Sequence, residues 1–215
     1  MPVVIRSVQI ATAAVGAITA ITAIVSIACS AATFFNAVDI APAQAQGVSE
    51  AAAGELLTAF KATCYDLMPD IAAAEKHATS KGWEPLTGMA LRMQSPDNTA
   101  KRLLGWKATV GSTKLTVSIA VTEMDPEMAT SIPDFAKSDV YGCSVTAAAN
   151  VDHDVLGADL AQFIGRKADE TTEADSPTGN VWAGTSTDLA VFVTHYWPKR
   201  GGKGINMLSR LAIPK

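Results

Sequence analysis

Cysteine and histidine are scarce in this chain of 215 residues, which contains three of each. No C-x-x-C pair is present, and its absence argues against a thiol-disulfide redox catalyst. The three histidines show none of the spacings that are typical of a zinc site. We therefore expect no metal ion and no other cofactor.

Two common catalytic motifs are also missing. The sequence has no G-x-S-x-G, and Gly142-Cys143-Ser144 lies inside a strand-like stretch rather than at the strand-to-helix turn that presents a nucleophilic serine. It also has no P-loop, which requires G-x-x-x-x-G-K-[ST] between a strand and a helix. With no recognisable active site, the sequence favours a protein that is not an enzyme.

Basic residues are not in excess. The formal net charge is −4, and a mildly acidic domain lacks the positive surface that holds a phosphate backbone. We therefore expect no nucleic-acid partner. Long apolar runs are rare as well, because residues 8–35 form the only stretch long enough to cross a membrane.

That apolar stretch lies just before a cleavage motif. Arg6 precedes it, and Ala43 and Ala45 match the A-x-A pattern of signal-peptide cleavage sites. These features predict a signal peptide over residues 1–45, cleaved after Ala45. Residues 46–215 are then a single exported domain, either periplasmic or secreted.

Two alternatives for the leader stay open. Residues 8–35 are long enough to remain as an N-terminal anchor, which would then be the membrane contact of the chain. The stretch Ser26-Ile27-Ala28-Cys29 loosely resembles a lipobox, in which the cysteine receives a lipid. All three outcomes place the domain outside the cytoplasm.

The periodicity of apolar residues predicts the fold class. Helical spacing indicates a first helix capped by Ser49, a second from Pro69 to Gly82 and a third over Asp152–Gly165. Alternating apolar residues indicate strands near 104–110, 115–121, 140–149, 180–185, 189–197 and 205–213. The pattern predicts an α+β fold: two N-terminal helices and one central helix packed on an antiparallel β-sheet built from about six strands.

Three stretches lack a clear pattern. Met89, Leu91 and Met93 alternate like a short strand within residues 87–100. Residues 123–138, which contain two prolines, are expected to form a loop. Residues 166–179 have no apolar periodicity and predict an exposed, mobile loop.

Cys64 and Cys143 are the only cysteines left after the leader is removed. Cys64 shares a helix face with Leu57 and Phe60, while Cys143 shares a strand face with Tyr141 and Val145. An even pair of inward-facing cysteines in an exported domain predicts a disulfide. The alternative is two buried thiols that act as small apolar side chains.

Asp152, His153 and His195 are the best candidates for catalytic chemistry. A histidine flanked by acids can serve as a general base or a metal ligand. Acids at the start of a helix, however, commonly cap it and complement its dipole. A histidine on an apolar strand is also more often a partly buried side chain than a ligand.

Lys199, Arg200 and Lys203 concentrate positive charge in a glycine-rich stretch between two predicted strands. The simplest interpretation is a hairpin turn whose basic side chains are solvated. A candidate function is the binding of an anion such as a lipid headgroup or an envelope polysaccharide.

The sequence thus predicts a small exported cell-envelope domain, a non-catalytic binding or accessory protein whose partner is an unidentified envelope component or anionic ligand. The alternative is an envelope hydrolase with a site assembled from Asp152, His153 and His195.

Overall fold

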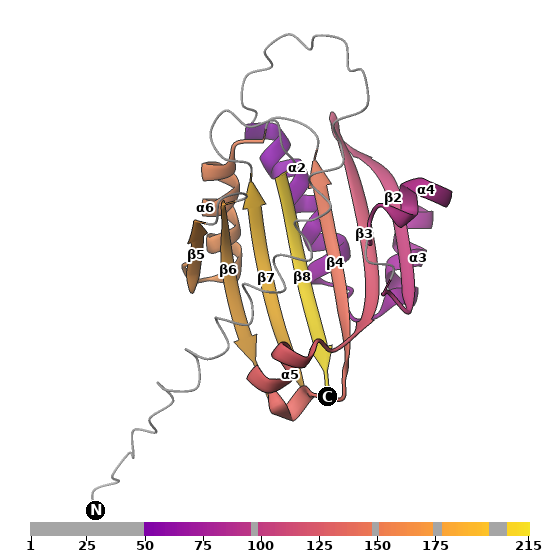
Figure 1. Ribbon diagram of the computed structural model, residues 1–215. Helices are drawn as coiled ribbons and strands as arrows, with labels where there is room; N and C mark the ends of the chain where they lie inside the picture. The colour runs from indigo at the N-terminus through magenta and orange to yellow at the C-terminus, as the bar shows by residue number, and fades with distance from the viewer. Residues whose placement is uncertain (1–49, 96–98, 148–150, 174–177, 198–205) are drawn as a thin grey trace, which may run out of the picture.

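A computed structural model describes residues 50–95, 99–147, 151–173, 178–197 and 206–215. Its centre is an eight-stranded antiparallel sheet in the order β1-β2-β3-β4-β8-β7-β6-β5 (Figure 1). The strands are β1 (Glu84–Pro85), β2 (Arg102–Val110), β3 (Thr113–Glu123), β4 (Asp139–Ala147), β5 (Glu170–Glu173), β6 (Thr178–Thr185), β7 (Leu189–Trp197) and β8 (Asn206–Pro214).

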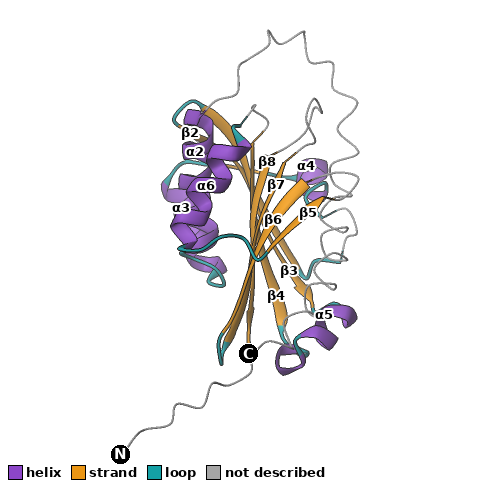
Figure 2. Ribbon diagram, turned by 90° about the vertical axis from the view of Figure 1, so that its left-hand side faces the viewer, coloured by secondary structure: helices purple, strands orange, loops and turns teal. Residues whose placement is uncertain are grey.

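The longer helices cover one face of this sheet. Figure 2 shows α2, α3 and α6 on one side, with α4 and α5 on the other. The helical elements are α2 (Glu50–Phe60), the π-helical turn η2 (Lys61–Tyr65), α3 (Ile71–Ser80), α4 (Gly88–Arg92), α5 (Pro126–Ser131), the 3-10 turn η3 (Pro133–Phe135) and α6 (His153–Ile164). The predicted α+β class is confirmed, with eight strands instead of about six.

The main core lies between the sheet and the helices α2, α3 and α6. Alternate strand residues such as Val117, Val145 and Leu208 are fully buried there against Phe60 and Leu156. Burying a side chain of this size contributes roughly 1.5–3 kcal/mol to folding. The period-two pattern of the sequence therefore identified this face on β3, β4 and β7. On β8 it indicated Met207, Leu211 and Ile213, which lie on the opposite face.

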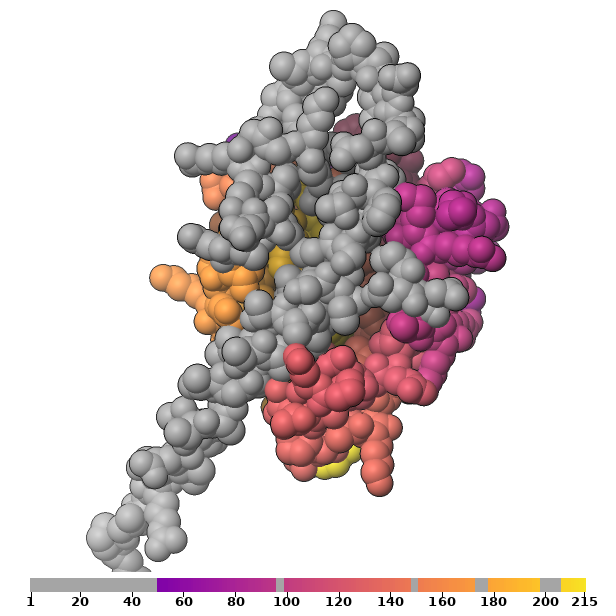
Figure 3. All heavy atoms as spheres, in the orientation of Figure 1, coloured from indigo at the N-terminus to yellow at the C-terminus, as the bar shows by residue number. Residues whose placement is uncertain are grey.

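The opposite face of the sheet is apolar at one end and polar in the middle. At the apolar end Met128 and Phe135, from α5 and η3, pack with Phe192, and the α5 region forms a raised mass in Figure 3. In the middle, paired hydroxyls lie at hydrogen-bond distance across neighbouring strands: Ser118 with Ser144 at 2.8 Å, and Thr194 with Ser209 at 2.6 Å.

These hydroxyl pairs show that the sheet consists of two similar halves. Strands β2-β3-β4 and β6-β7-β8 meet at the β4–β8 junction, where Ser144 pairs with Ser209. Trp106 and Trp182 occupy equivalent positions on β2 and β6. Because β4 and β8 are antiparallel, equivalent helices in the two halves would begin at opposite ends of the sheet. Both α2 and α6 begin at the same end, so the repeat does not extend to the helices. There Glu55 of α2 contacts the β2–β3 turn, and His153 of α6 contacts the end of β7.

Three expectations from the sequence are wrong. Residues 88–92 form α4 instead of a strand, and 126–135 hold α5 and η3 instead of a plain loop. Asp125 caps α5, and Pro126 suits its first turn. Residues 170–173 of the expected loop form the edge strand β5, because pairing with β6 outweighs their weak local preference.

The helix boundaries follow the predicted caps where they are described. The Asp70 and Asp152 carboxylates accept backbone N–H groups at the starts of α3 and α6. Gly82 and Gly165 follow these helices at positive φ, where glycine costs least. Ser49 lies outside the described residues. Among the residues described, no helix is long and apolar enough to span a membrane.

Candidate functional site

Cys64 and Cys143 form a disulfide at the centre of the fold. Cys64 of η2 and Cys143 of β4 have Cα atoms 5.3 Å apart, 79 residues apart in sequence. Both side chains are buried, with at most 1% exposed. The predicted bond is therefore present, and its burial suits a structural disulfide better than a redox-active one.

Arg210 lies beside this disulfide and was not singled out by the sequence. It pairs with Cys143 across β4 and β8, and only 7% of it is exposed. Its Nη1 donates to the backbone carbonyls of Cys64, Tyr65 and Met68. Burial lowers the pKa of the guanidinium. Since a helix leaves its last carbonyls unpaired, Arg210 caps the end of the α2–η2 segment.

His195 of β7 is fully buried under α6. An added Cβ at Gly157 of α6 would lie 3.6 Å from both His195 Nδ1 and Asn180 Nδ2, so the helix backbone covers this histidine closely. Neither ring nitrogen has a hydrogen-bond partner in the described structure. Burial, followed by the nearby His153, lowers the pKa of His195 to about 3.

The structure brings together two of the residues that the sequence proposed as catalytic. His153, the first residue of α6, stacks on Trp197 at 5.4 Å between ring centroids, with an interplanar angle of 15°. The ring of His195 lies 4.6 Å from the same Trp197. We call this group, His153, Trp197 and His195, the histidine stack. It lies where β7 ends and β8 begins.

Asp152 does not join the stack as a catalytic acid. Its carboxylate accepts the backbone N–H groups of Asp154 and Val155, both at 3.1 Å, and so caps α6. The carboxylate nearest to His153 is that of Asp154, at 3.6 Å from Nε2 and 88% exposed. A general base requires an orienting partner within hydrogen-bond reach and a pKa near the working pH. His195 has neither among the described residues.

Sequence reasoning missed the polar residues around His195. Asn180 on β6 pairs with His195 across the strands, and Asn206 begins β8 with its Oδ1 buried and without a hydrogen-bond partner in the described structure. The alternation on β7 placed Trp197 on the same face as His195. The contact with His153, however, depends on how α6 packs on β7, which no local pattern encodes.

The basic residues follow the histidine stack directly in the sequence. Trp197 ends β7, and Lys199, Arg200 and Lys203 come within the next six residues. These three candidates for an anion-binding loop lie outside the described residues. In the described part of the chain, no group of three His, Cys, Asp or Glu side chains could hold a metal ion.

A groove of about 260 Å³ lies at the opposite edge of the sheet, between α3, α4 and β2. Its floor is apolar, with Leu86, Leu104 and Trp106, and its rim includes Glu75. Glu75 forms an ion pair with Arg102. The groove carries no cluster of catalytic side chains.

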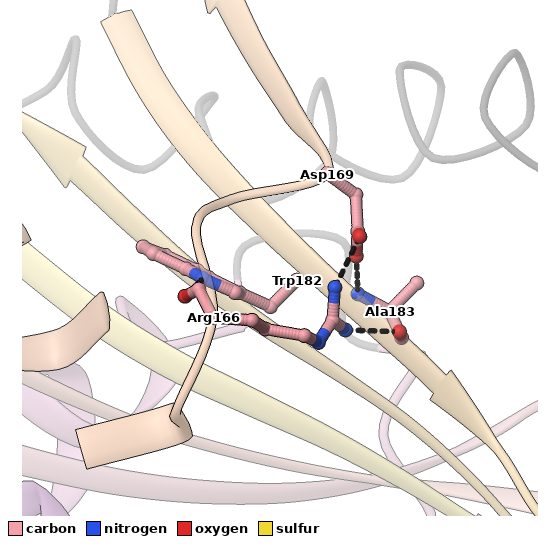
Figure 4. Close-up of polar contacts among 4 residues, drawn as sticks. All are labelled: Arg166, Asp169, Trp182 and Ala183. Atoms are coloured by element: carbon pink, nitrogen blue, oxygen red, sulfur yellow. Dashed lines mark hydrogen bonds and ion pairs between the residues drawn. The ribbon is translucent and has the colours of Figure 1, made fainter. Parts of the chain in front are cut away.

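A second polar cluster closes the edge of the sheet next to β5. Asp169 pairs with Arg166 and accepts the backbone N–H of Ala183 at 2.6 Å, while Arg166 donates to the Ala183 carbonyl (Figure 4). The indole of Trp182 donates to the Arg166 carbonyl at 3.1 Å. These side chains form hydrogen bonds with the backbone of β6 at Ala183, which lies outside the part of β6 that pairs with β5. The cluster is therefore structural.

Comparison with known proteins adds no functional assignment. The chain matches no known protein-family model, and no curated protein or solved structure is significantly similar to it.

Proposed function

We propose that this chain is an exported cell-envelope domain that works by binding and is stabilised for that environment by its disulfide. The Cys64–Cys143 bond is the observation that carries the proposal. Disulfides form and persist in oxidising compartments and are rare in the cytosol. The leader over residues 1–45 supports the same location.

Binding without catalysis accounts best for the polar residues of the fold. Asp152 is used as a helix cap, and Arg210 and Asp169 bind backbone groups. His195 is enclosed beneath α6, where a bound substrate would not reach it without movement of the helix. These roles weigh against an envelope hydrolase built on Asp152, His153 and His195.

The binding region that we propose is the basic stretch after Trp197. Lys199, Arg200 and Lys203 add three positive charges in five residues to a chain with a net charge of −4. His153, whose side chain is 35% exposed, lies at the end of β7 that precedes this stretch. An anionic envelope component, either a lipid headgroup or a polysaccharide, fits this concentration of charge.

Binding to two anionic probes tests this proposal. Protein purified with its disulfide intact is mixed at low salt with phosphatidylglycerol vesicles, with phosphatidylcholine vesicles and with a soluble anionic polysaccharide. The triple variant Lys199→Gln, Arg200→Gln and Lys203→Gln should bind at least several-fold more weakly to one anionic probe. Its melting temperature should barely change, since exposed charges outside networks usually contribute about 0.5 kcal/mol or less.

A matched control removes the same charge elsewhere. Lys76, Lys81 and Arg92 are exposed on α3, next to it and on α4, and their replacement by glutamine changes the net charge equally. Retained binding in this control assigns the interaction to the basic stretch. Equal losses in both triple variants, or no binding of the wild type to either anionic probe, would contradict the proposed site.

A further inference from the structure

The burial of His195 and its position beneath α6 disfavour a positive charge on its ring. The side chain is fully buried, and neither nitrogen has a hydrogen-bond partner in the described part of the chain. His153 lies against Trp197, which also contacts His195, and its proximity lowers the pKa of His195 further. Both histidines lie under or at the first turns of α6, the positive end of the helix dipole.

No described carboxylate offsets the cost of a positive charge on His195. On α6, the Asp152 carboxylate accepts the backbone N–H groups of Asp154 and Val155, and the largely exposed Asp154 lies 3.6 Å from His153 Nε2. On β6 the cross-strand neighbour is the amide of Asn180, and on β8 it is Leu208. Other charged groups on this side of the sheet are engaged elsewhere: Arg210 binds carbonyls at the end of η2, and Glu55 of α2 binds the amides of Ser112 and Thr113.

We propose that the histidine stack is an acid-sensitive latch, in which protonation of His195 releases the first turns of α6 from β7. The latch is closed when His195 is neutral, because an uncharged ring stays buried between α6, Trp197 and β8 at a smaller cost than a cation. A proton on either nitrogen creates a buried, unpaired cation, which is costly. Opening of α6 returns the ring to water. This proposal depends neither on export nor on a bound ligand.

Proton linkage gives the direction in which pH shifts the open–closed equilibrium and the pH range over which it does so. When α6 is open, His195 titrates near its ordinary pKa of 6.5, and in the closed state its pKa lies at about 3. The open state therefore binds more protons between these values. The closed state is fully favoured above about pH 6.5, and its advantage falls as the pH drops towards 3. At pH 4.5 the ratio of open to closed molecules should rise by up to about a hundredfold.

Hydrogen exchange measured by mass spectrometry tests the latch in the disulfide-bonded protein. Peptides that cover 153–160 and 191–197 are compared at pH 7.5 and 4.5, after correction for the intrinsic pH dependence of amide exchange. Wild type should lose protection in the 153–160 peptide at pH 4.5, while β3, β4 and the 191–197 peptide, which pairs with β6 and β8, stay protected. His195→Phe, which keeps an aromatic ring but has no titrating group, should abolish most of that pH dependence.

His77→Gln is the matched control. This half-buried histidine on α3 contacts Trp83 and is remote from α6, so the variant should behave as wild type. An unchanged acid response in His195→Phe would overturn the latch. So would a proton NMR titration of wild type in which the His195 ring titrates near pH 6.5 in the folded protein. That titration also decides the matter if His195→Phe does not fold.

Discussion

Arg210 and His195 are buried polar residues on adjacent strands, but the structure treats them differently. Arg210 donates to three backbone carbonyls, whereas the His195 nitrogens have no partner among the described residues. A buried polar group without a hydrogen bond costs free energy, and a buried unpaired charge costs far more. Arg210 is bonded through its Nη1, although its Nε has no partner among the described residues, whereas His195 avoids the larger cost only while its ring is neutral. This difference makes Arg210 a source of stability and His195 a source of pH dependence.

Replacement of Arg210 should destabilise the fold strongly. Arg210→Met fills the volume but leaves the carbonyls of Cys64, Tyr65 and Met68 without their shared donor. Hydrogen bonds to charged groups contribute about 1.5–3 kcal/mol, and unpaired buried acceptors add a penalty. We expect a loss of about 2–4 kcal/mol in urea unfolding, with Arg210→Lys in between. A change below about 1 kcal/mol in Arg210→Met would show that water or another donor replaces the guanidinium.

Glu55 allows a second test of how a charged side chain that binds backbone groups contributes to stability, here at the surface. Its carboxylate accepts the amides of Ser112 and Thr113 at 3.1 and 2.9 Å, and hydrogen bonds from Thr113 and Ser112 lower its pKa. The stabilisation is present above the ordinary pKa of 4.5 and is lost as the pH falls through the lowered value in the folded state. Glu55→Gln should therefore lower the urea midpoint at pH 7 but have little effect near pH 2.5.

The control for Glu55 is Glu84→Gln. Glu84 forms an exposed ion pair with Lys107 at 3.3 Å, and such pairs contribute little to stability. A Glu55→Gln effect that is no larger than the Glu84→Gln effect, or that persists unchanged at pH 2.5, would contradict the role assigned to Glu55.

At the scale of elements, side chains of the α6–β5 connection replace a missing piece of strand. Asp169 and Arg166 bind the N–H and the carbonyl of Ala183 on β6. Unpaired edge groups invite pairing with other chains. The Arg166–Asp169 pair therefore protects β6 where β5 no longer covers it.

Asp169→Ala should cost about 1–2 kcal/mol, since it loses a hydrogen bond to Ala183 and the contact with Arg166. Arg166→Ala should cost a similar amount, and the double variant should cost less than the sum because the two residues act together. Thermal and urea unfolding measure the three values. Lys167→Ala, an exposed neighbour, is the control. Strict additivity of the two single variants would mean that the pair does not act as a unit.

The elements that could be predicted from the sequence are those with a strong local signal. Cys64 in register with Phe60, and Cys143 with Val145, indicated which sides of the helix and the strand would meet. Caps at Asp152 and Gly165 located α6. In each case the structure depends on a requirement that a few neighbouring residues meet, either the burial of an apolar face or the pairing of a backbone group at a helix end.

The elements that could not be predicted depend on distant partners. The strand β5 exists because it pairs with β6. The short helix α4 packs over Gly105, where an added Cβ would lie 2.9 Å from Leu86 and 3.3 Å from Leu91. The histidine stack requires α6 to lie across the end of β7. Local patterns contain no information on such contacts, so the candidate site was recognised only as separate residues.

At the scale of the whole molecule, the disulfide ties the N-terminal helix to the centre of the sheet. Closing a loop whose ends are 79 residues apart in sequence restricts the unfolded chain by about 4.5 kcal/mol as a ceiling, with measured effects commonly near 2–4 kcal/mol. Cys64→Ala and Cys143→Ala should each lower stability by about 2–4 kcal/mol, and the double variant should be no worse than either single one. A single variant as stable as the wild type would remove this role from the bond.

The central claim is an exported, disulfide-bonded domain, and one measurement tests both parts. The intact mass of the protein from its native envelope is recorded before and after reduction and thiol alkylation. The account predicts a chain that begins at Gln46 and takes up alkylating reagent at Cys64 and Cys143 only after reduction. A mass that includes residues 1–45, a lipid on Cys29, or two thiols that react without reduction would contradict it.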